Sequence, residues 1–247
     1  MPIPLLHIYV NDDDPNQLLD HTPEKEWTLP LSQIRKLLEF LDTRVDPGCA
    51  LIDGYEPLLY GKPLLHLIAS LRLYGWDPSV MTRGAFISHL ENPKQKLEIL
   101  YRAGLSCLQL YFTEAILQKL GLEGIEQIFL LINNGPITIA SHYYYDGNGP
   151  HRAVYLQGLM HNLNFNRISH MLYIDSLENQ DQVLRQKNKN VEQELFPRFI
   201  VGHKGTLALS STQGEKKFHC SLLADGWQSI VDGWLVLPKR EADAAVS

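Results

Sequence analysis

The chain has 247 residues, of which 45% are hydrophobic, so it can bury a sizeable core as one α/β domain or as one domain with a small appendage. Its formal net charge of −6 argues against a dedicated nucleic-acid binder, which needs a basic face to meet phosphates. No run of about 18 apolar residues occurs, which excludes a membrane-spanning helix. The first residues lack the basic region and cleavage site of a signal peptide, so we expect a cytoplasmic protein without membrane or nucleic-acid partners.

The three cysteines, Cys49, Cys107 and Cys220, stand far apart in the sequence. No Cys-x-x-Cys pair exists to begin a zinc site, a redox dithiol or an iron–sulfur cluster. An odd number of cysteines in a cytoplasmic chain also argues against a disulfide framework. We therefore expect the three thiols to be small buried apolar residues, and we expect no metal site.

Strands and helices alternate along the first half of the chain. Residues 5–10 form an apolar run that is typical of a buried parallel strand. The polar, turn-forming residues 11–30 follow, and apolar residues at helical spacing then predict a helix over 31–41. The turn Asp46-Pro47-Gly48 leads into a second strand at 50–52.

The alternation continues to about residue 133. The expected elements are a helix from Pro63 to Gly75, a strand at 79–82, a helix from Asn92 to Gly104, a strand at 107–112, a short helix over 113–120 and a strand over 125–132. This rhythm predicts right-handed βαβ units and a parallel sheet. Later in the chain, residues 137–155 indicate a hairpin or a strand with a turn, and two antiparallel strands are expected at 206–210 and 217–222.

The stretch Leu51-Ile52-Asp53-Gly54-Tyr55-Glu56-Pro57-Leu58 follows the second strand, at the end where α/β sheets bind their ligands. It resembles the Gly-Gly-Glu-Pro-Leu signature of the radical S-adenosylmethionine (SAM) family, with Tyr55 in place of one Gly. Thr82-Arg83-Gly84 resembles the Thr-Asn-Gly that follows the family's third strand. From residue 3 to about 112 the order of parts is similar to the first half of a radical SAM barrel. Residues 202–220 faintly resemble the SPASM or twitch extension of peptide-modifying members.

The resemblance implies a partial (β/α) barrel of radical SAM type over residues 1–135. The remaining barrel elements and a small C-terminal β-containing extension would occupy residues 136–247. If SAM binding is retained, the resemblance implies these cofactor-binding positions: Gly54, Tyr55, Glu56, Pro57, Thr82 and Gly84. In the family, the Glu-Pro motif presents backbone carbonyls and a carboxylate to the amino group of SAM.

The residues themselves also allow a purely structural interpretation of this motif. Gly54 and Pro57 would make the strand-to-helix turn, while Glu56 would stabilise a helix N-terminus through the helix dipole. Tyr55 crowds a position that the family keeps as Gly, which argues against ordinary SAM binding.

The loop that should carry the family's three cluster cysteines holds no thiol between residues 11 and 20. An iron–sulfur cluster needs thiolate ligands, so we expect no [4Fe–4S] cluster and no reductive cleavage of SAM. The loop is instead rich in carboxylates, at Asp12–Asp14 and Asp20, with His21 beside them. These side chains suit a hard cation such as Mg²⁺, but the Gly and bidentate Glu of a calcium loop are missing, and a solvated loop is the alternative.

The remaining candidate residues are histidines. His142 lies beside three tyrosines, and together with His161 and His170 it is a candidate for lining a pocket. The alternative is that these are ordinary, partly buried histidines. No pair has the spacing of a metalloprotease motif, and we assign no catalytic residue.

Three functions follow from this pattern. The first is a non-catalytic, radical SAM-like protein that acts as a partner or scaffold for a peptide substrate or a cluster-bearing radical SAM enzyme, in peptide or natural-product modification. Its association surface would include exposed apolar residues at Tyr143–Tyr145, Trp227 and Trp234. The second is a cluster-free enzyme that binds SAM or another small ligand and performs polar chemistry with Glu56 or a histidine as acid or base. The third is an α/β enzyme unrelated to the family.

Overall fold

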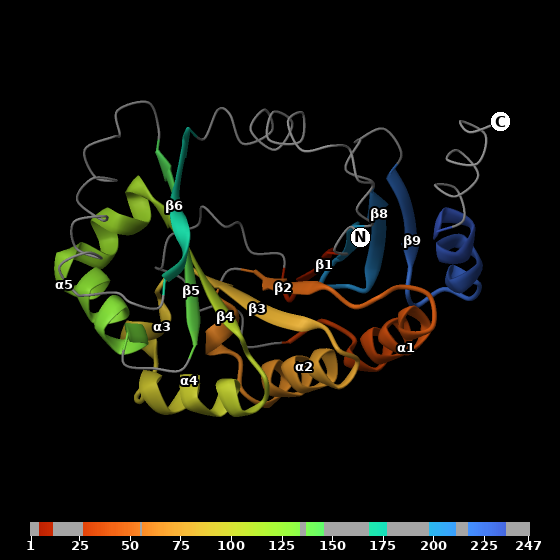
Figure 1. Ribbon diagram of the computed structural model, residues 1–247, viewed down its shortest axis with the longest axis horizontal. Helices are drawn as coiled ribbons and strands as arrows, with labels where there is room; N and C mark the ends of the chain where they lie inside the picture. Colours follow the sequence, from red (N-terminus) through yellow and green to blue (C-terminus); the bar gives the residue numbers. More distant parts are fainter. Residues whose placement is uncertain are drawn as a thin grey trace.

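The computed structural model describes residues 5–11, 27–54, 56–133, 137–145, 168–176, 198–210 and 217–235. Within them, nine strands form one sheet in the order β6-β5-β4-β3-β2-β1-β7-β8-β9. All neighbours from β6 to β7 are parallel, and β8 is antiparallel to both of its neighbours, β7 and β9. The described sheet is not closed, and this mixed α/β architecture is compatible with a partial α/β barrel (Figure 1).

The strands are β1 (Leu5–Tyr9), β2 (Cys49–Asp53), β3 (Asp77–Thr82), β4 (Cys107–Thr113), β5 (Thr138–Tyr145), β6 (Ile168–Ser176), β7 (Arg198–Val201), β8 (Thr206–Ser210) and β9 (Lys217–Ser221). The helices are α1 (Leu31–Asp42), the 3-10 turn η1 (Pro57–Leu59), α2 (Lys62–Leu73), α3 (Phe86–His89), α4 (Pro93–Arg102) and α5 (Glu114–Asn133). A further helical segment spans residues 227–235.

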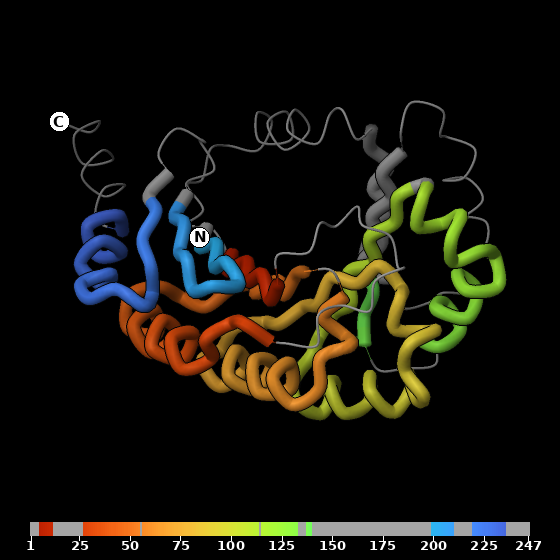
Figure 2. Tube along the Cα trace, turned by 180° about the vertical axis from the view of Figure 1, so that it is seen from behind, coloured from red at the N-terminus to blue at the C-terminus, as the bar shows by residue number. Residues whose placement is uncertain are grey.

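The two faces of the parallel sheet differ in chemistry because side chains alternate along each strand. One face carries fully buried apolar residues that form the core beneath the helices, such as Ile8, Ile52 and Val80. Figures 1 and 2 show α1, α2 and α4 on the outer side of the curved sheet. The opposite face, which we call the inner face, presents His7, Tyr9, Asp53, Ser79, Met81, Gln109 and Tyr111.

The helices of the first half follow the sequence signals. In α1 the buried residues Ile34, Leu37, Leu38 and Leu41 share one face, as the periodicity predicts. Helix α4 begins at the predicted cap, where the side chain of Asn92 accepts a hydrogen bond from the backbone N–H of Gln95 at 3.0 Å.

The predicted strand over residues 125–132 is wrong, because these residues lie in α5. Ile125, Ile128, Phe129 and Ile132 are buried, and their spacing of three and four residues places them on one helical face. Gly121 has a φ of 66° and kinks the helix there, so the short helix expected over 113–120 continues beyond the glycine. Strand β5 takes the place next to β4 instead.

The C-terminal strands predicted at 206–210 and 217–222 are confirmed as the antiparallel pair β8 and β9. The exposure expected for two tryptophans is wrong: Trp227 and Trp234 are only 3% and 6% exposed. Their rings meet Phe40 of α1 and Phe199 of β7 edge to face, at 5.2 and 5.8 Å between centroids. A spacing of seven residues puts both tryptophans on one face of the helical segment, which packs onto the domain.

The burial expected for the cysteines is also wrong. Cys49 is exposed, while Cys107 and Cys220 are half-buried. Cys49 and Cys107 begin their strands on the inner face, away from the apolar core under the helices. Among the described residues, no helix is both long and apolar enough to cross a membrane.

Candidate functional site

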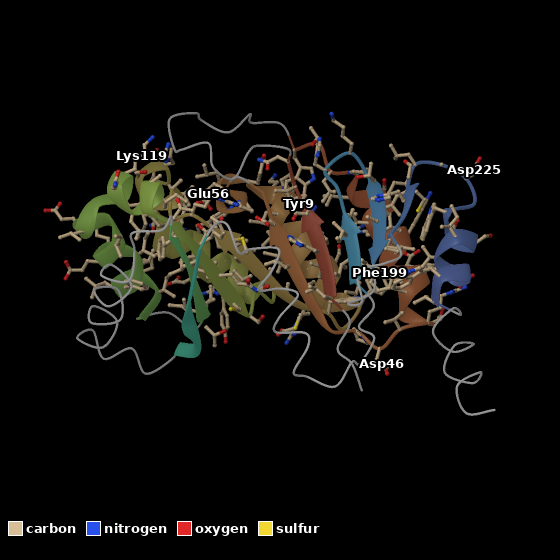
Figure 3. All side chains as sticks on the ribbon, turned by 90° about the horizontal axis from the view of Figure 1, so that it is seen from above. Tyr9, Asp46, Glu56, Lys119, Phe199 and Asp225 are labelled. Carbon is tan, nitrogen blue, oxygen red and sulfur yellow. The ribbon has the colours of Figure 1, made fainter. Side chains whose placement is uncertain are left out.

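The predicted site residues gather where β2 and β3 end. Gly54 follows β2, Pro57 begins η1, Thr82 ends β3, and Gly84 lies two residues beyond it. Tyr55 lies outside the described residues. Figure 3 shows Glu56 and Tyr9 toward one end of the strands and Asp46, which precedes β2, toward the other. The sequence therefore placed the motif at the carboxyl edge of the sheet, where α/β folds hold ligands.

Glu56 connects the ends of the two strands. It is fully buried, and its Oε2 accepts hydrogen bonds from the Thr82 hydroxyl at 2.8 Å and from the N–H groups of Arg83 at 3.3 Å and Ala85 at 3.0 Å. Ala85 immediately precedes α3, so the carboxylate does meet a helix start, as the structural interpretation predicts. The helix is α3, however, and not η1, which follows Glu56 in the chain.

The second oxygen of Glu56, Oε1, differs from Oε2 in its hydrogen bonding. Among the described residues, Oε1 has no hydrogen-bond partner although it is buried. Burial raises the pKa of Glu56 above its usual value, outweighing the hydrogen bond from Thr82 and the charge of Arg83. Burial therefore makes Glu56 harder to ionise than an exposed glutamate, and Oε1 is the carboxyl oxygen without a hydrogen-bond partner among the described residues.

Arg83 is the residue at this site whose role the sequence motif does not reveal. Its side chain is 4% exposed, its Nη1 donates to the Gly54 carbonyl, and its Nη2 lies 3.6 Å from Oδ1 of Asp53. The guanidinium carbon lies 5.2 Å from the centre of the Tyr111 ring, within cation–π range. The only signal in the sequence was the departure Thr-Arg-Gly from the family pattern.

Asp53 extends the cluster to β1. Its Oδ2 lies 3.2 Å from Nε2 of His7, and its Oδ1 accepts a hydrogen bond from the Gly54 N–H at 2.7 Å. The His7 ring stacks on Tyr9 with 4.3 Å between centroids. Burial alone raises the pKa of Asp53, but the hydrogen bond from His7 and the charge of Arg83 more than offset it, so the pKa lies below its usual value. His7 and Asp53 were also missed, although a polar residue inside an apolar strand run is a signal.

Both site glycines are required by the backbone. Gly54 has a φ of 149°, and a Cβ there would lie 2.6 Å from Oδ1 of Asn11. Gly84 has a φ of 88°, and a Cβ there would lie 2.6 Å from Cδ1 of Ile128 in α5. The glycines of the motif thus let the strand ends approach neighbouring elements closely.

Several other sequence candidates cannot be placed. The acidic loop with Asp12–Asp14, Asp20 and His21 lies outside the described residues, as does His161. The side chains of His142 and His170 on β5 and β6, and those of Tyr143–Tyr145, are outside the description as well.

The thiols do not fit an iron–sulfur cluster. Cys49 begins β2, Cys107 begins β4 and Cys220 lies on β9, so the three stand on separate strands, none of them at the carboxyl end of β1–β3. A cluster requires thiolates that converge on one site. Among the residues that the structure describes, no group of three His, Cys, Asp or Glu side chains could hold a metal ion.

Comparison with known proteins gives little further information. No protein-family model matches the chain. A search of curated proteins finds no match. A similar solved structure is that of SuiB from Streptococcus suis, with 10% sequence identity and a TM-score of 0.41 over 83% of this chain. The match spans 60% of the SuiB chain, and at this TM-score the likeness carries no argument about function.

Proposed function

We propose that this chain is a non-catalytic protein with a radical SAM-like half-barrel. In this proposal it acts as a partner or scaffold for a peptide substrate or for a cluster-bearing radical SAM enzyme, in peptide or natural-product modification. The observation that supports the proposal is that the Gly54 carbonyl and one of the two oxygens of Glu56 are already held by donors of the same chain. Arg83 holds the Gly54 carbonyl, and Thr82, Arg83 and Ala85 hold one oxygen of Glu56.

A ligand amino group would have to compete for these acceptors. Entry at the Gly54 carbonyl requires the displacement of a buried guanidinium that also faces Asp53. A buried charge that loses its partner costs several kcal/mol, about 3–5 kcal/mol where one member of a pair is removed. The arrangement therefore favours a structural role for the motif over SAM binding.

The inner face of the sheet is the surface that we propose for the partner. Tyr9, Met81 and Tyr111 are half-buried there, and no described helix covers this face (Figure 1). Tyrosine and methionine are enriched in protein interfaces, where their large side chains add contact area. The outer face, by contrast, is already packed against α1, α2 and α4.

A binding experiment with two matched variants tests this proposal. Purified protein is mixed with a cluster-bearing, peptide-modifying radical SAM enzyme from the same source, and separately with that enzyme's peptide substrate, and complex formation is measured by analytical ultracentrifugation. Met81→Glu places a charge on the inner face, whereas Leu73→Glu places one on α2, where Leu73 is 78% exposed. Wild type and Leu73→Glu should bind one of the two, and Met81→Glu should bind at least about tenfold more weakly, which corresponds to about 1.4 kcal/mol.

Two outcomes contradict the scaffold proposal. One is that folded wild-type protein forms no complex with either the enzyme or the peptide. The other is that Met81→Glu, shown by circular dichroism to be folded, binds as tightly as Leu73→Glu does.

A second candidate is a cluster-free enzyme that binds SAM or another small ligand and performs polar chemistry. Two observations favour it: the buried Oε1 of Glu56 has no partner among the described residues, and His7 is oriented by Asp53. A carboxyl with a raised pKa and an oriented imidazole are the usual groups for acid–base catalysis. Binding of a small amino-bearing ligand by wild type, lost in Glu56→Ala, would move this candidate ahead of the scaffold.

A further inference from the structure

Three groups among the described residues meet the guanidinium of Arg83. The Gly54 carbonyl accepts from Nη1, the Asp53 carboxylate faces Nη2 at 3.6 Å, and the Tyr111 ring lies 5.2 Å from the guanidinium carbon. The two charged side chains are 4% and 10% exposed, so water screens their attraction little.

We infer that the Gly54 carbonyl, the Asp53 carboxylate and the Tyr111 ring form a guanidinium-binding site whose resident ligand is Arg83 of the same chain. An external alkylguanidinium binds there once the Arg83 side chain is shortened, and in the wild-type chain Arg83 excludes external cations from the Gly54 turn. This inference does not depend on the scaffold proposal, because it concerns only what the site recognises.

The geometry selects a guanidinium over an ammonium. A guanidinium is planar and carries donors on separate nitrogens, so it can meet the carbonyl and the carboxylate at once while its face lies over an aromatic ring. An ammonium is a compact point charge and is more strongly hydrated. Its three donors all lie on one nitrogen, so it is less suited to span the carbonyl and the carboxylate while contacting the face of Tyr111.

The walls of the site do not depend on the Arg83 side chain. The Asp53 carboxylate is also held by the Gly54 N–H and by His7. The backbone at Arg83 is held by Glu56, through its own N–H and through the neighbouring Thr82 hydroxyl. Shortening Arg83 to alanine should therefore leave a preformed space beside an Asp53 carboxylate that has lost the charge of the guanidinium.

Thermal unfolding of Arg83→Ala with and without methylguanidinium tests the inference. Millimolar methylguanidinium should raise the Tm of Arg83→Ala by about 3–6 °C, the shift expected for a ligand at roughly ten times its Kd in a domain of this size. Methylammonium should raise it by less than half as much. Neither ion should raise the Tm of the wild type, in which Arg83 occupies the site.

Arg44 supplies a matched control. Its guanidinium also meets a carboxylate, Asp232 at 2.6 Å, a carbonyl, Phe40 at 3.0 Å, and the Phe40 ring at 3.7 Å. These contacts are exposed to solvent, with the paired side chains 34% and 48% accessible. Arg44→Ala should therefore show no methylguanidinium-dependent rise in Tm.

Equal responses of Arg83→Ala, Arg44→Ala and wild type would overturn the inference, and so would a stronger effect of methylammonium. If Arg83→Ala is recovered only unfolded, the yield of folded protein on refolding replaces Tm as the readout. Methylguanidinium should then increase the refolding yield of Arg83→Ala but not that of Arg44→Ala, and the absence of such an increase also contradicts the site.

Discussion

The two ends of strand β3 carry ion pairs of opposite character. At the amino end, Asp77 pairs with Arg72 at 3.1 Å, and both side chains are more than half exposed. At the carboxyl end, Arg83 faces Asp53 at 3.6 Å, and both side chains are at least nine-tenths buried. The shorter pair contributes less to stability, because solvent screens it. Removing Arg83 from the buried pair leaves the Asp53 charge away from water and without the guanidinium that offsets it. Burial, and not distance, therefore marks the carboxyl edge as the organised region.

The largest loss of stability is expected when the buried ion pair is broken. Arg83→Ala should lower the free energy of unfolding by about 3–5 kcal/mol, because Asp53 keeps its charge in a buried site. Urea denaturation followed by circular dichroism measures this loss. A loss below about 1 kcal/mol, as expected for an exposed ion pair, would contradict the difference proposed between the two ends of β3.

Two substitutions of Glu56 test how much this side chain stabilises the carboxyl edge of the sheet. Glu56→Ala should cost about 2–4 kcal/mol, since the Thr82 hydroxyl and two N–H groups lose their acceptor. Glu56→Gln should cost clearly less, because the amide oxygen can still accept these hydrogen bonds and the neutral side chain carries no charge into the buried site. Urea denaturation at neutral pH compares the two, and equal losses would indicate that the ionised carboxylate is the form that the fold requires.

The packing of the β3–α3 turn provides a test that involves no charge. Gly84→Ala should lower the free energy of unfolding by about 1–3 kcal/mol, because its φ is positive and the added Cβ meets Ile128. The control is Gly233→Ala, at a position where a Cβ would meet no atom within 4 Å. Similar Tm values for the two variants would show that the turn can relax.

The pH dependence of stability should separate the two buried carboxyls. The pKa of Glu56 is raised in the folded chain, so its stabilising contribution is present at low pH and is lost as pH rises through the folded value. The pKa of Asp53 is lowered, so its contribution is present above the unfolded value and is lost as pH falls through the folded value.

Unfolding curves at a series of pH values test this difference. Wild type should lose stability relative to Glu56→Gln as pH rises above the usual range for Glu. It should lose stability relative to Asp53→Asn as pH falls below the usual range for Asp. Parallel curves for wild type and both variants would mean that neither carboxyl titrates differently on folding.

The smallest effect is expected at the exposed end of β3. Arg72→Ala should change the free energy of unfolding by no more than about 1 kcal/mol, the usual value of a solvent-exposed ion pair. Salt should weaken even this difference. A loss as large as that of Arg83→Ala would contradict the distinction between the two ends.

Local patterns in the sequence were sufficient for the main strand and helix of each of the first three βα units and for the fourth strand. The stripe of Ile34, Leu37, Leu38 and Leu41 and the cap at Asn92 each depend on neighbours within one helical turn, so periodicity reveals them. Residues 125–132 were misassigned because a short run of apolar residues suits a buried strand as well as a buried helix.

The charged cluster depends on contacts between distant segments. His7, Asp53 and Arg83 come from three strands that meet only after the parallel sheet has formed, and no spacing within the sequence connects them. The motif correctly located Gly54 and Glu56 at the end of β2. It did not reveal that the Arg83 side chain binds the Gly54 carbonyl, because this depends on where that side chain points. The burial of Trp227 and Trp234 likewise requires the helical segment to pack on Phe40 and Phe199, far away in sequence.

The most direct test of the central claim is a calorimetric titration of wild-type protein with SAM. Because the chain's own donors hold the Gly54 carbonyl and Oε2 of Glu56, wild type should give no binding heat at millimolar SAM, and Glu56→Gln should give the same flat titration. Binding of SAM by wild type in the micromolar range, lost on Glu56→Ala, would contradict the structural role of the motif and establish a working ligand site.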